Sequence, residues 1–456
     1  MKLRRIQVIG YGAGDAGNNL AFSLTSMFLL VYYTDVVGLS PAAVGTMFLI
    51  VRIWDALADI LAGRLVDRTQ TRWGKFRPYI LFGAVPLLLL NVATFHVPEM
   101  SSGAELAYAY VTYALLGLAY SLVNIPYGSL ATAMTQEPRE RARLAAARGV
   151  GVAVIILILV LVISPALQGG GDLQGTLTAV TWIFAVAGAA MYLFTFLTSK
   201  EAVPRAVARV TLRQTVAAMR GNRPLLMLCA SALVYLTGMS SLTAVGVYYA
   251  RDVLGDPSLF IVLTVVTTAE LFVVAPLAPV LVARIGKRRA YVLSGGLSVA
   301  GGLGVFLAPA DPVALPIFFW AVAGLGTALV NTLMWALEAD TVEYGEWRSG
   351  VRTEGATYAV FSFTRKLGQA LGAAAGAYAL ALGGYAAQAA QQSEGALTAI
   401  RFAAGAAPAV TALLAIAIMW FYPLTERRFA EIVTEVAQRR DHASAPDKQP
   451  REALDR

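Results

Sequence analysis

Two aspartates stand four residues apart inside a long apolar stretch, "VRIWDALADILAGRLVDRTQTRWGKFRPY", residues 51–79. At this spacing Asp55 and Asp59 share one face of a helix with Arg52, and one arginine cannot neutralise both carboxylates. Close carboxylates repel, so one of them can hold a proton near neutral pH. Carboxylate oxygens with nearby hydroxyls also suit a small hard cation. The pair therefore predicts a cation-coupling site, and an internal ion pair that only holds helices together is the alternative.

The composition indicates whether this helix face is exposed to water or lies within a membrane. The chain has 456 residues, 57% of them hydrophobic and only 14% charged, with a mean hydropathy of +0.63. Soluble domains have about a quarter of their residues charged, and about 20 apolar residues span a bilayer core. We therefore predict a polytopic, all-α membrane protein. A charge at the bilayer centre costs about 2.5–3.5 kcal/mol, so charges there mark a path for an ion or substrate.

Apolar runs predict twelve membrane-spanning helices. The expected spans are residues 10–35, 41–66, 77–97, 104–133, 144–166, 177–198, 224–250, 258–283, 289–309, 313–337, 353–381 and 399–422. They divide the chain into a six-helix half (1–199), a connecting loop (200–223), a second six-helix half (224–426) and a disordered tail (427–456). Two such halves with a binding site between them fit the major facilitator plan.

The loops between these spans alternate in charge. One set is rich in Lys and Arg, including "RLVDRTQTRWGKFR" and "RIGKRR", whereas the other set is mainly acidic. By the positive-inside rule the basic set and both termini are cytoplasmic. The formal charge of +8 is therefore a topology signal and not a sign of nucleic-acid binding. We expect a bacterial inner-membrane protein with the lipid bilayer as a partner, and nothing requires more than a monomer.

Basic and polar groups also occur within the other predicted spans. Lys366, next to Arg365, falls midway along the eleventh span, and Arg148 lies in the first turns of the fifth, where snorkelling to the interface is the alternative role. The first and fourth spans add side chains that could bind sugar hydroxyls or could only bond helices together. These side chains are Asp15, Asn18, Asn19, Tyr120, Ser121 and Asn124.

Other chemistry has no support in the sequence. It has no nucleotide-binding loop and no Cys/His metal spacing, and its single cysteine, Cys229, lies in an apolar run. An intramembrane enzyme could use the aspartates as acid and base, but no nucleophile or metal set accompanies them. We therefore expect no enzyme and no cofactor other than a coupling H⁺ or Na⁺.

Five stretches together resemble the glycoside–pentoside–hexuronide cation symporters, the group that contains melibiose permease. They are "YYTDVVGLS", "RIWDALADILAGRLVDRTQTRWGKFRPY", "NIPYGSL", "RERARLAAAR" and "EADTVEYGEWRSGVRTEG". The resemblance runs to about Tyr422 and implies a major facilitator fold with sugar uptake coupled to a proton, sodium or lithium ion. Related carriers move lysolipids, which is the alternative cargo.

The resemblance also implies roles for individual residues. Asp55 and Asp59 match the cation-binding aspartates, where sodium is the metal alternative, and Ser121 replaces a threonine that helps to hold the cation. Tyr120 and Arg148 match sugar-site positions, and Lys366 matches a lysine that links the sugar and cation regions. The substrate-binding set expected in full is Asp15, Asn18, Asn19, Tyr120, Asn124, Arg148, Asn331 and Lys366.

The chain departs from melibiose-type members at several of these positions. Ala58 replaces an asparagine that supplies a cation oxygen, which favours protons over sodium. Asn19 and Asn124 replace aspartates, Asn18 replaces a lysine, and Gly128 and Asn331 replace tryptophans. The pocket is thus more amide-like, and "GDAGNN" is similar to the glucuronide and pentoside branches.

Two further expectations follow from the charges. With no aspartates expected near Arg148 and Lys366, a sugar carboxylate would match both basic groups. Cytoplasmic charge networks are expected to latch the outward-facing state. Their predicted gating residues are Asp67, Arg68, Arg141 and Asp340.

Overall fold

The computed structural model describes residues 3–135, 137–167, 172–201, 220–350, 354–387, 389 and 391–444, which are almost entirely helical and contain no β-strand. The long helices of the first half are α1 (Arg5–Val31), α2 (Pro41–Arg68), α3 (Arg77–Thr94), α4 (Ser102–Met134), α5 (Pro138–Ile163) and α6 (Leu173–Thr198). Those of the rest are α8 (Arg223–Tyr248), α9 (Leu259–Ile285), α10 (Lys287–Leu307), α11 (Ala314–Ser349), α12 (Glu354–Leu382), α13 (Glu394–Arg401), α14 (Ala407–Trp420) and α15 (Glu426–Ser444). Short segments η1 (Tyr32–Val36), η2 (Ser164–Leu167), η3 (Tyr249–Val253) and η4 (Phe402–Ala406) extend or join them.

Each of the twelve predicted spans falls on one of these helices, with α13, η4 and α14 together forming the last. In the described part of the chain, nine helices are long and apolar enough to cross a membrane by length and composition alone. The three remaining long helices of the bundle, α1, α2 and α12, carry most of the charged residues singled out above, including Asp15, Asp55, Asp59 and Lys366. The all-α membrane fold is confirmed, and polarity is concentrated in the helices expected to hold the site.

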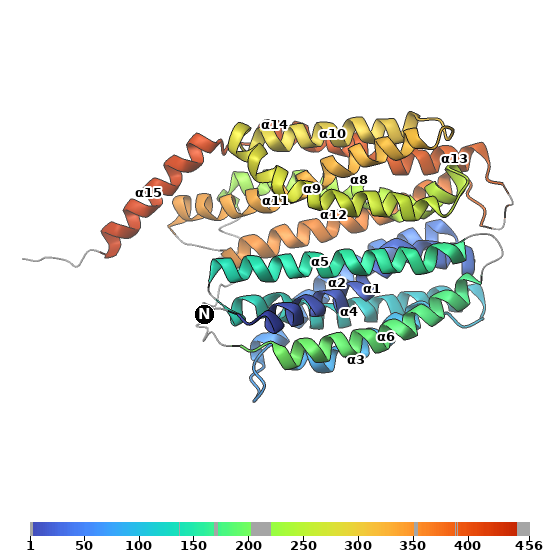
Figure 1. The fold of residues 1–456 in the computed structure, drawn as a ribbon, viewed down its shortest axis with the longest axis horizontal. Coiled ribbons are helices and arrows are strands. Elements are labelled where there is room, and N and C mark those ends of the chain that lie inside the picture. The colour runs from blue at the N-terminus through green and yellow to red at the C-terminus, as the bar shows by residue number, and fades with distance from the viewer. Residues whose placement is uncertain are drawn as a thin grey trace, which may run out of the picture.

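The helices form two groups, which Figure 1 shows side by side with their long axes roughly parallel. Within the first group, α1 packs on α5 and α6, and α3 packs on α4 and α6. Within the second group, α8 packs on α12 and α14, and α10 packs on α11. Between the groups, α2 contacts α12, α5 contacts α9 and α1 contacts α8. We call this contact region the seam.

Glycines let α12 approach α8 closely. A Cβ atom at Gly372 would lie 2.1 Å from the Thr237 carbonyl oxygen, and one at Gly368 would lie 2.7 Å from the Leu233 carbonyl oxygen. Neither distance is possible for a side chain, so these positions accept glycine alone at this helix separation. The backbone of α12 is therefore fixed against α8, which sets the position of the basic residues on its other face.

The two groups join at one end of the bundle, which carries η1 and η3 and which we call the π-helix end. One hydrophobic cluster there draws buried side chains from both groups; for example, the rings of Phe28 and Phe260 meet edge to face at 5.9 Å. We call the opposite end of the bundle, where α1 begins and α15 lies, the terminal end. There each group has its own hydrophobic cluster. Apolar packing therefore closes the seam at the π-helix end.

The helix α15 covers residues 427–444 of the tail that was expected to be disordered. Ile432 and Val436 are buried against the second group, and Trp347 on α11 donates a 2.6 Å hydrogen bond to Glu435. Apolar residues at helical spacing give this polar segment one face to bury, which is why it folds. Residues 445–456 of the predicted tail lie outside the described residues.

Candidate substrate and cation site

Asp59 on α2 bonds to both helix groups at the seam. Ser121 on α4 donates a 2.6 Å hydrogen bond to its Oδ1 atom, and the Lys366 ammonium on α12 forms an ion pair with its Oδ2 atom. The Asp59 side chain is 25% exposed, so the carboxylate is largely withdrawn from solvent. The structure thus brings together three residues that the sequence singled out, from three different helices.

Asp55 lies one turn away and has its own partner. Arg52 donates a 3.2 Å hydrogen bond to its Oδ2 atom. Its Oδ1 atom is buried with no hydrogen-bond partner among the described residues, and it presses on Gly117 of α4, where a Cβ would lie 2.0 Å away. Arg52 therefore serves only one of the two aspartates, as the sequence indicated, and Lys366 from α12 neutralises the other. What remains is a buried carboxylate oxygen that can still accept a proton or a cation.

Arg148 does not lack a carboxylate, contrary to the sequence expectation. It donates a 3.0 Å hydrogen bond to Asp15 on α1, and its guanidinium lies 5.4 Å from the centre of the Tyr127 ring. Asp15 is 4% exposed, so an unpaired charge there would be expensive and Arg148 offsets it. With Lys366 paired to Asp59, both basic groups proposed for a sugar carboxylate already have acidic partners.

The amides of α1 point in different directions. Asn18 is completely buried and accepts a 2.8 Å hydrogen bond from Tyr192 on α6, so its side chain lies inside the first group and away from the seam. Asn19 is half-buried and donates to the Asp15 carbonyl oxygen at 2.9 Å while it accepts from Ser23 at 3.2 Å. Consecutive residues differ by about 100° around a helix, which separates the two amides.

Two residues of α4 present partly exposed polar side chains near the aspartates. Tyr120 stacks on Phe22 at 5.7 Å between ring centres, and Asn124 is half-buried. One turn further along, Gly128 is exposed, and a Cβ there would meet nothing within 4 Å. The position that holds a tryptophan in melibiose-type members therefore opens onto free space in this chain.

Asn331 on α11 accepts a 2.8 Å hydrogen bond from Arg365 on α12. The Arg365 guanidinium lies over two aromatic rings, 5.0 Å from the centre of Trp335 and 5.7 Å from that of Phe361. The sequence predicted Asn331 as a substrate residue but gave Arg365 no role of its own. The structure makes the two side chains one unit that links α11 to α12.

The predicted gating residues are only partly described. Asp340 is 7% exposed and pairs with Lys287 on α10 at 2.6 Å, a contact within one helix group and not across the seam. Arg68 is exposed at the end of α2. The side chains of Asp67 and Arg141 lie outside the described residues, so the latch stays a prediction.

A charged cluster at the π-helix end was missed by the sequence analysis. Arg251 in η3 pairs with Asp35 in η1 at 2.6 Å and with the adjacent Asp252 at 3.0 Å. Tyr385 donates to both Asp35 oxygens at 3.0 Å, and burial raises the pKa of this phenol, so it remains a donor. These residues tie the first helix group to the second beside the shared hydrophobic cluster.

A repeated stretch of sequence could have revealed this cluster. Residues 31–38 read "VYYTDVVG" and residues 247–255 read "VYYARDVLG". Both stretches form a π-helix that ends before a glycine with positive φ, at Gly38 (81°) and Gly255 (76°). The two copies place Asp35 and Arg251 at equivalent turns of the two groups, where they meet as opposite charges.

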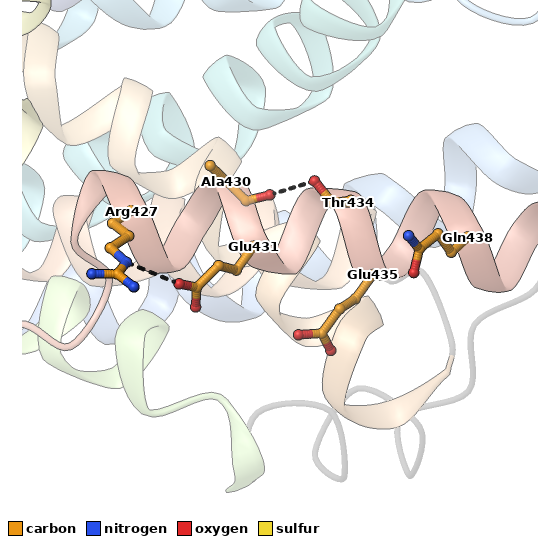
Figure 2. Close-up of a pocket in the computed structure, with 6 residues that line it drawn as sticks. All are labelled: Arg427, Ala430, Glu431, Thr434, Glu435 and Gln438. Atoms are coloured by element: carbon orange, nitrogen blue, oxygen red, sulfur yellow. Dashed lines mark hydrogen bonds and ion pairs between the residues drawn. The ribbon is translucent and has the colours of Figure 1, made fainter.

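A hollow along α15, drawn in Figure 2, is a poor candidate for the substrate site. All of its lining residues lie on one helix: Arg427, Ala430, Glu431, Thr434, Glu435 and Gln438. A single helix surface cannot enclose a ligand, and Arg427 already pairs with Glu431 at 3.2 Å. The cluster of paired charges at the seam is the better candidate.

Comparison with known proteins identifies the chain as similar to membrane transporters. A family model described as MFS/sugar transport protein matches residues 10–426. The glucuronide carrier protein homolog of Escherichia coli (strain K12) is 45% identical over 95% of this chain and 95% of its own. The putative sulfoquinovose importer of Salmonella typhimurium is 35% identical over 96% of this chain and 94% of its own.

Solved structures agree on the fold. A bacterial homolog of the human lysosomal transporter Spinster superposes with a TM-score of 0.69, at 14% sequence identity, over 94% of this chain and 97% of its own. This similarity extends to the arrangement of helices alone. It confirms the major facilitator architecture that the span pattern and the sequence resemblance predicted.

Proposed function

This chain belongs to the MFS/sugar transport protein family, and from that premise we propose that it imports a glycoside, specifically a hexuronide, together with a proton. Family membership makes it a multi-pass membrane transporter of the sugar symport type and not an enzyme. The acidic cargo is supported by the names of two relatives, because a glucuronide carries a carboxylate and sulfoquinovose a sulfonate. The coupling ion and the named residues are our proposal.

The observation that carries the coupling proposal is the double attachment of Asp59. Its carboxylate bonds to Ser121 in its own helix group and to Lys366 in the other group. A coupling cation that binds Asp59 competes with the Lys366 ammonium for the same oxygen. Binding of the cation therefore breaks an ion pair across the seam, which couples its arrival to a movement of one group against the other.

A proton suits the residues around this site better than sodium. Asp55 offers one buried oxygen with no hydrogen-bond partner among the described residues. Position 58, between the two carboxylates, is a completely buried alanine and provides no further oxygen. A sodium ion needs several oxygen ligands at once, whereas a proton needs only one carboxylate oxygen in a poorly solvated place. We therefore assign proton binding to the Asp55–Asp59 pair.

Alternating access fits the way in which the seam is closed. The π-helix end is joined by shared apolar packing and by the Arg251–Asp35 pair. If the basic loops face the cytoplasm, as the positive-inside rule predicts, the π-helix end is the outer end. The conformation described here is then closed to the outside. The outward-facing state requires the contacts at the π-helix end to break.

Uptake by right-side-out membrane vesicles tests this proposal. We expect an imposed proton gradient to drive accumulation of 4-nitrophenyl β-D-glucuronide, and an imposed sodium gradient to drive none. The Asp59→Asn variant is expected to abolish uphill accumulation but retain exchange of labelled for unlabelled glucuronide, because the amide is uncharged like a protonated carboxyl group but cannot release a proton. Accumulation driven by sodium alone would refute the proton assignment. An Asp59→Asn variant that still concentrates glucuronide would refute the role of Asp59.

A further inference from the structure

Arg365 differs from the other basic side chains at the seam in its partners. Arg52 pairs with Asp55, Arg148 with Asp15 and Lys366 with Asp59. Among the described residues, no carboxylate lies within ion-pair distance of Arg365, whose hydrogen-bond partners are an amide oxygen and a thioether sulfur. These four basic groups therefore share three carboxylates, and one positive charge is left over.

The surroundings of Arg365 hold the guanidinium in place without neutralising it. Its Nη2 atom donates to Asn331 at 2.8 Å, and its Nη1 atom donates to the sulfur of Met334 at 3.5 Å. Trp335 and Phe361 lie against the guanidinium and attract it through their ring faces. An arginine is costly inside a membrane, and neutral partners of this kind stabilise it while its formal charge persists.

The free charge lies one helical step from the lysine of the cation site and bonds to a predicted substrate residue. Arg365 immediately precedes Lys366, whose ammonium holds Asp59. Its partner Asn331 is exposed and matches a position that the sequence resemblance assigns to substrate binding. Trp335 is also 38% exposed and offers a flat apolar surface next to the guanidinium. A sugar bound at this place would meet a positive charge, an amide and an aromatic face together.

We propose that Arg365 is the anchor for the carboxylate of the transported hexuronide. A guanidinium presents its N–H groups in a planar fork that matches a carboxylate with two parallel hydrogen bonds. A monoanionic sugar would cancel the one unmatched charge among the four basic groups, and the side of its ring could pack on Trp335. Asn331 positions the guanidinium for this contact. The inference rests on the proposed function and names the residue that recognises the acidic substrate.

A purely structural role for Arg365 predicts different behaviour. If the side chain only links α11 to α12, its loss would weaken binding of acidic and neutral sugars equally, through a general loosening of the site. An anchoring role predicts a loss confined to acidic sugars. The comparison therefore needs two ligands that differ only in the carboxylate, and 4-nitrophenyl β-D-glucuronide and 4-nitrophenyl β-D-glucoside are such a pair.

Dissociation constants of the purified, detergent-solubilised protein for this pair provide the test. The wild type is expected to prefer the glucuronide. Arg365→Gln is expected to weaken glucuronide binding by about 10- to 100-fold, the range for a charge-assisted hydrogen bond, and glucoside binding by less than about threefold. The matched control Arg148→Gln, whose guanidinium is already paired with Asp15, is expected to weaken both ligands to a similar extent.

A second variant keeps the test informative if Arg365→Gln does not fold. Asn331→Asp is nearly isosteric and gives Arg365 a carboxylate partner, so it is expected to lower the preference for glucuronide to the same degree. An unchanged preference in either folded variant would overturn the anchor, as would equal binding of both sugars by the wild type. A wild type that binds neither sugar would instead refute the proposed function and the anchor with it.

Discussion

The ion pair between Arg251 and Asp35 is expected to set the balance between the two conformations of the transporter. Arg251→Gln removes the ionic partner of Asp35, which keeps its hydrogen bonds from Tyr385, and leaves no positive charge between Asp35 and Asp252. The side chains of Arg251 and Asp35 are 21% and 10% exposed, so this pair is closer to a buried than to a surface ion pair. Both carboxylates regain water when the π-helix end opens, and the variant therefore favours the open form.

The size of the shift follows from this burial. Breaking a buried ion pair costs about 3–5 kcal/mol, whereas an exposed pair contributes at most about 1 kcal/mol. A value of about 2–3 kcal/mol suits the exposures observed here, which corresponds to a change of about 30- to 150-fold in the equilibrium. A protein that is open at the π-helix end for about 1% of the time would then be open for about a quarter of the time or more.

Cysteine labelling measures this change. The single native cysteine, Cys229, is replaced by serine, and a cysteine is introduced in place of Ala377, which is 0% exposed and contacts Gly45 across the seam. In right-side-out vesicles, a membrane-impermeant maleimide is expected to label Arg251→Gln at least tenfold faster than the unsubstituted background.

The control removes an ion pair that does not cross the seam. Arg427 pairs with Glu431 on the exposed surface of α15, and its side chain is 92% exposed. Arg427→Gln is expected to leave the labelling rate of the introduced cysteine unchanged. Equal labelling rates in Arg251→Gln and in the background would refute the role of the Arg251–Asp35 pair in closing the outer end.

Further predictions concern the stability of the detergent-solubilised protein and are checked by thermal unfolding or by limited proteolysis. Gly372→Ala is expected to lower the melting temperature by several degrees because the new Cβ meets the Thr237 carbonyl oxygen. Gly296→Ala is expected to leave the melting temperature unchanged, because a Cβ at Gly296 meets nothing within 4 Å. Ile432→Asp is expected to release α15 from the bundle, because the Ile432 side chain is completely buried. Val433→Asp is expected to leave α15 in place, because the Val433 side chain is 40% exposed. Limited proteolysis measures the release, and equal cleavage of α15 in both variants would contradict this prediction. Asn222→Ala is expected to cost about 1–2 kcal/mol because Asn222 caps α8 and bonds to the Thr341 carbonyl oxygen; an unchanged melting temperature would contradict this.

The span pattern could be predicted from the sequence because apolar runs of bilayer length are a strong signal. The contact between Asp59 and Ser121 was expected from the family resemblance, whereas the pairing of Asp59 with Lys366 was not, because no aspartate was expected near that lysine. Helical spacing relates residues within one helix, whereas these three side chains come from α2, α4 and α12. Nothing in the sequence alone fixes which faces of three separate helices meet.

The errors have a common physical origin. The Arg148–Asp15 pair joins residues 133 positions apart, and the sequence does not show how α5 is rotated against α1. Asn18 and Asn19 are neighbours, yet one helical step sends the first into the α1–α6 contact. The tail was judged by its polarity, which hid the buried stripe of Ile432 and Val436 on α15. In each case, the unknown was the direction in which a helix face points.

The polarity of α2 also has a consequence for how the protein is made. Its three charged residues at mid-helix make it a poor candidate for entering the bilayer alone, because each charge costs about 2.5–3.5 kcal/mol there. Lys366, which neutralises Asp59, is added 307 residues later. At about 5–20 residues per second, the ribosome takes about 15–60 s to reach it. Until then Ser121 is the described partner of Asp59, so the first half of a nascent chain must wait in the membrane, incompletely neutralised, for the second half to be synthesised.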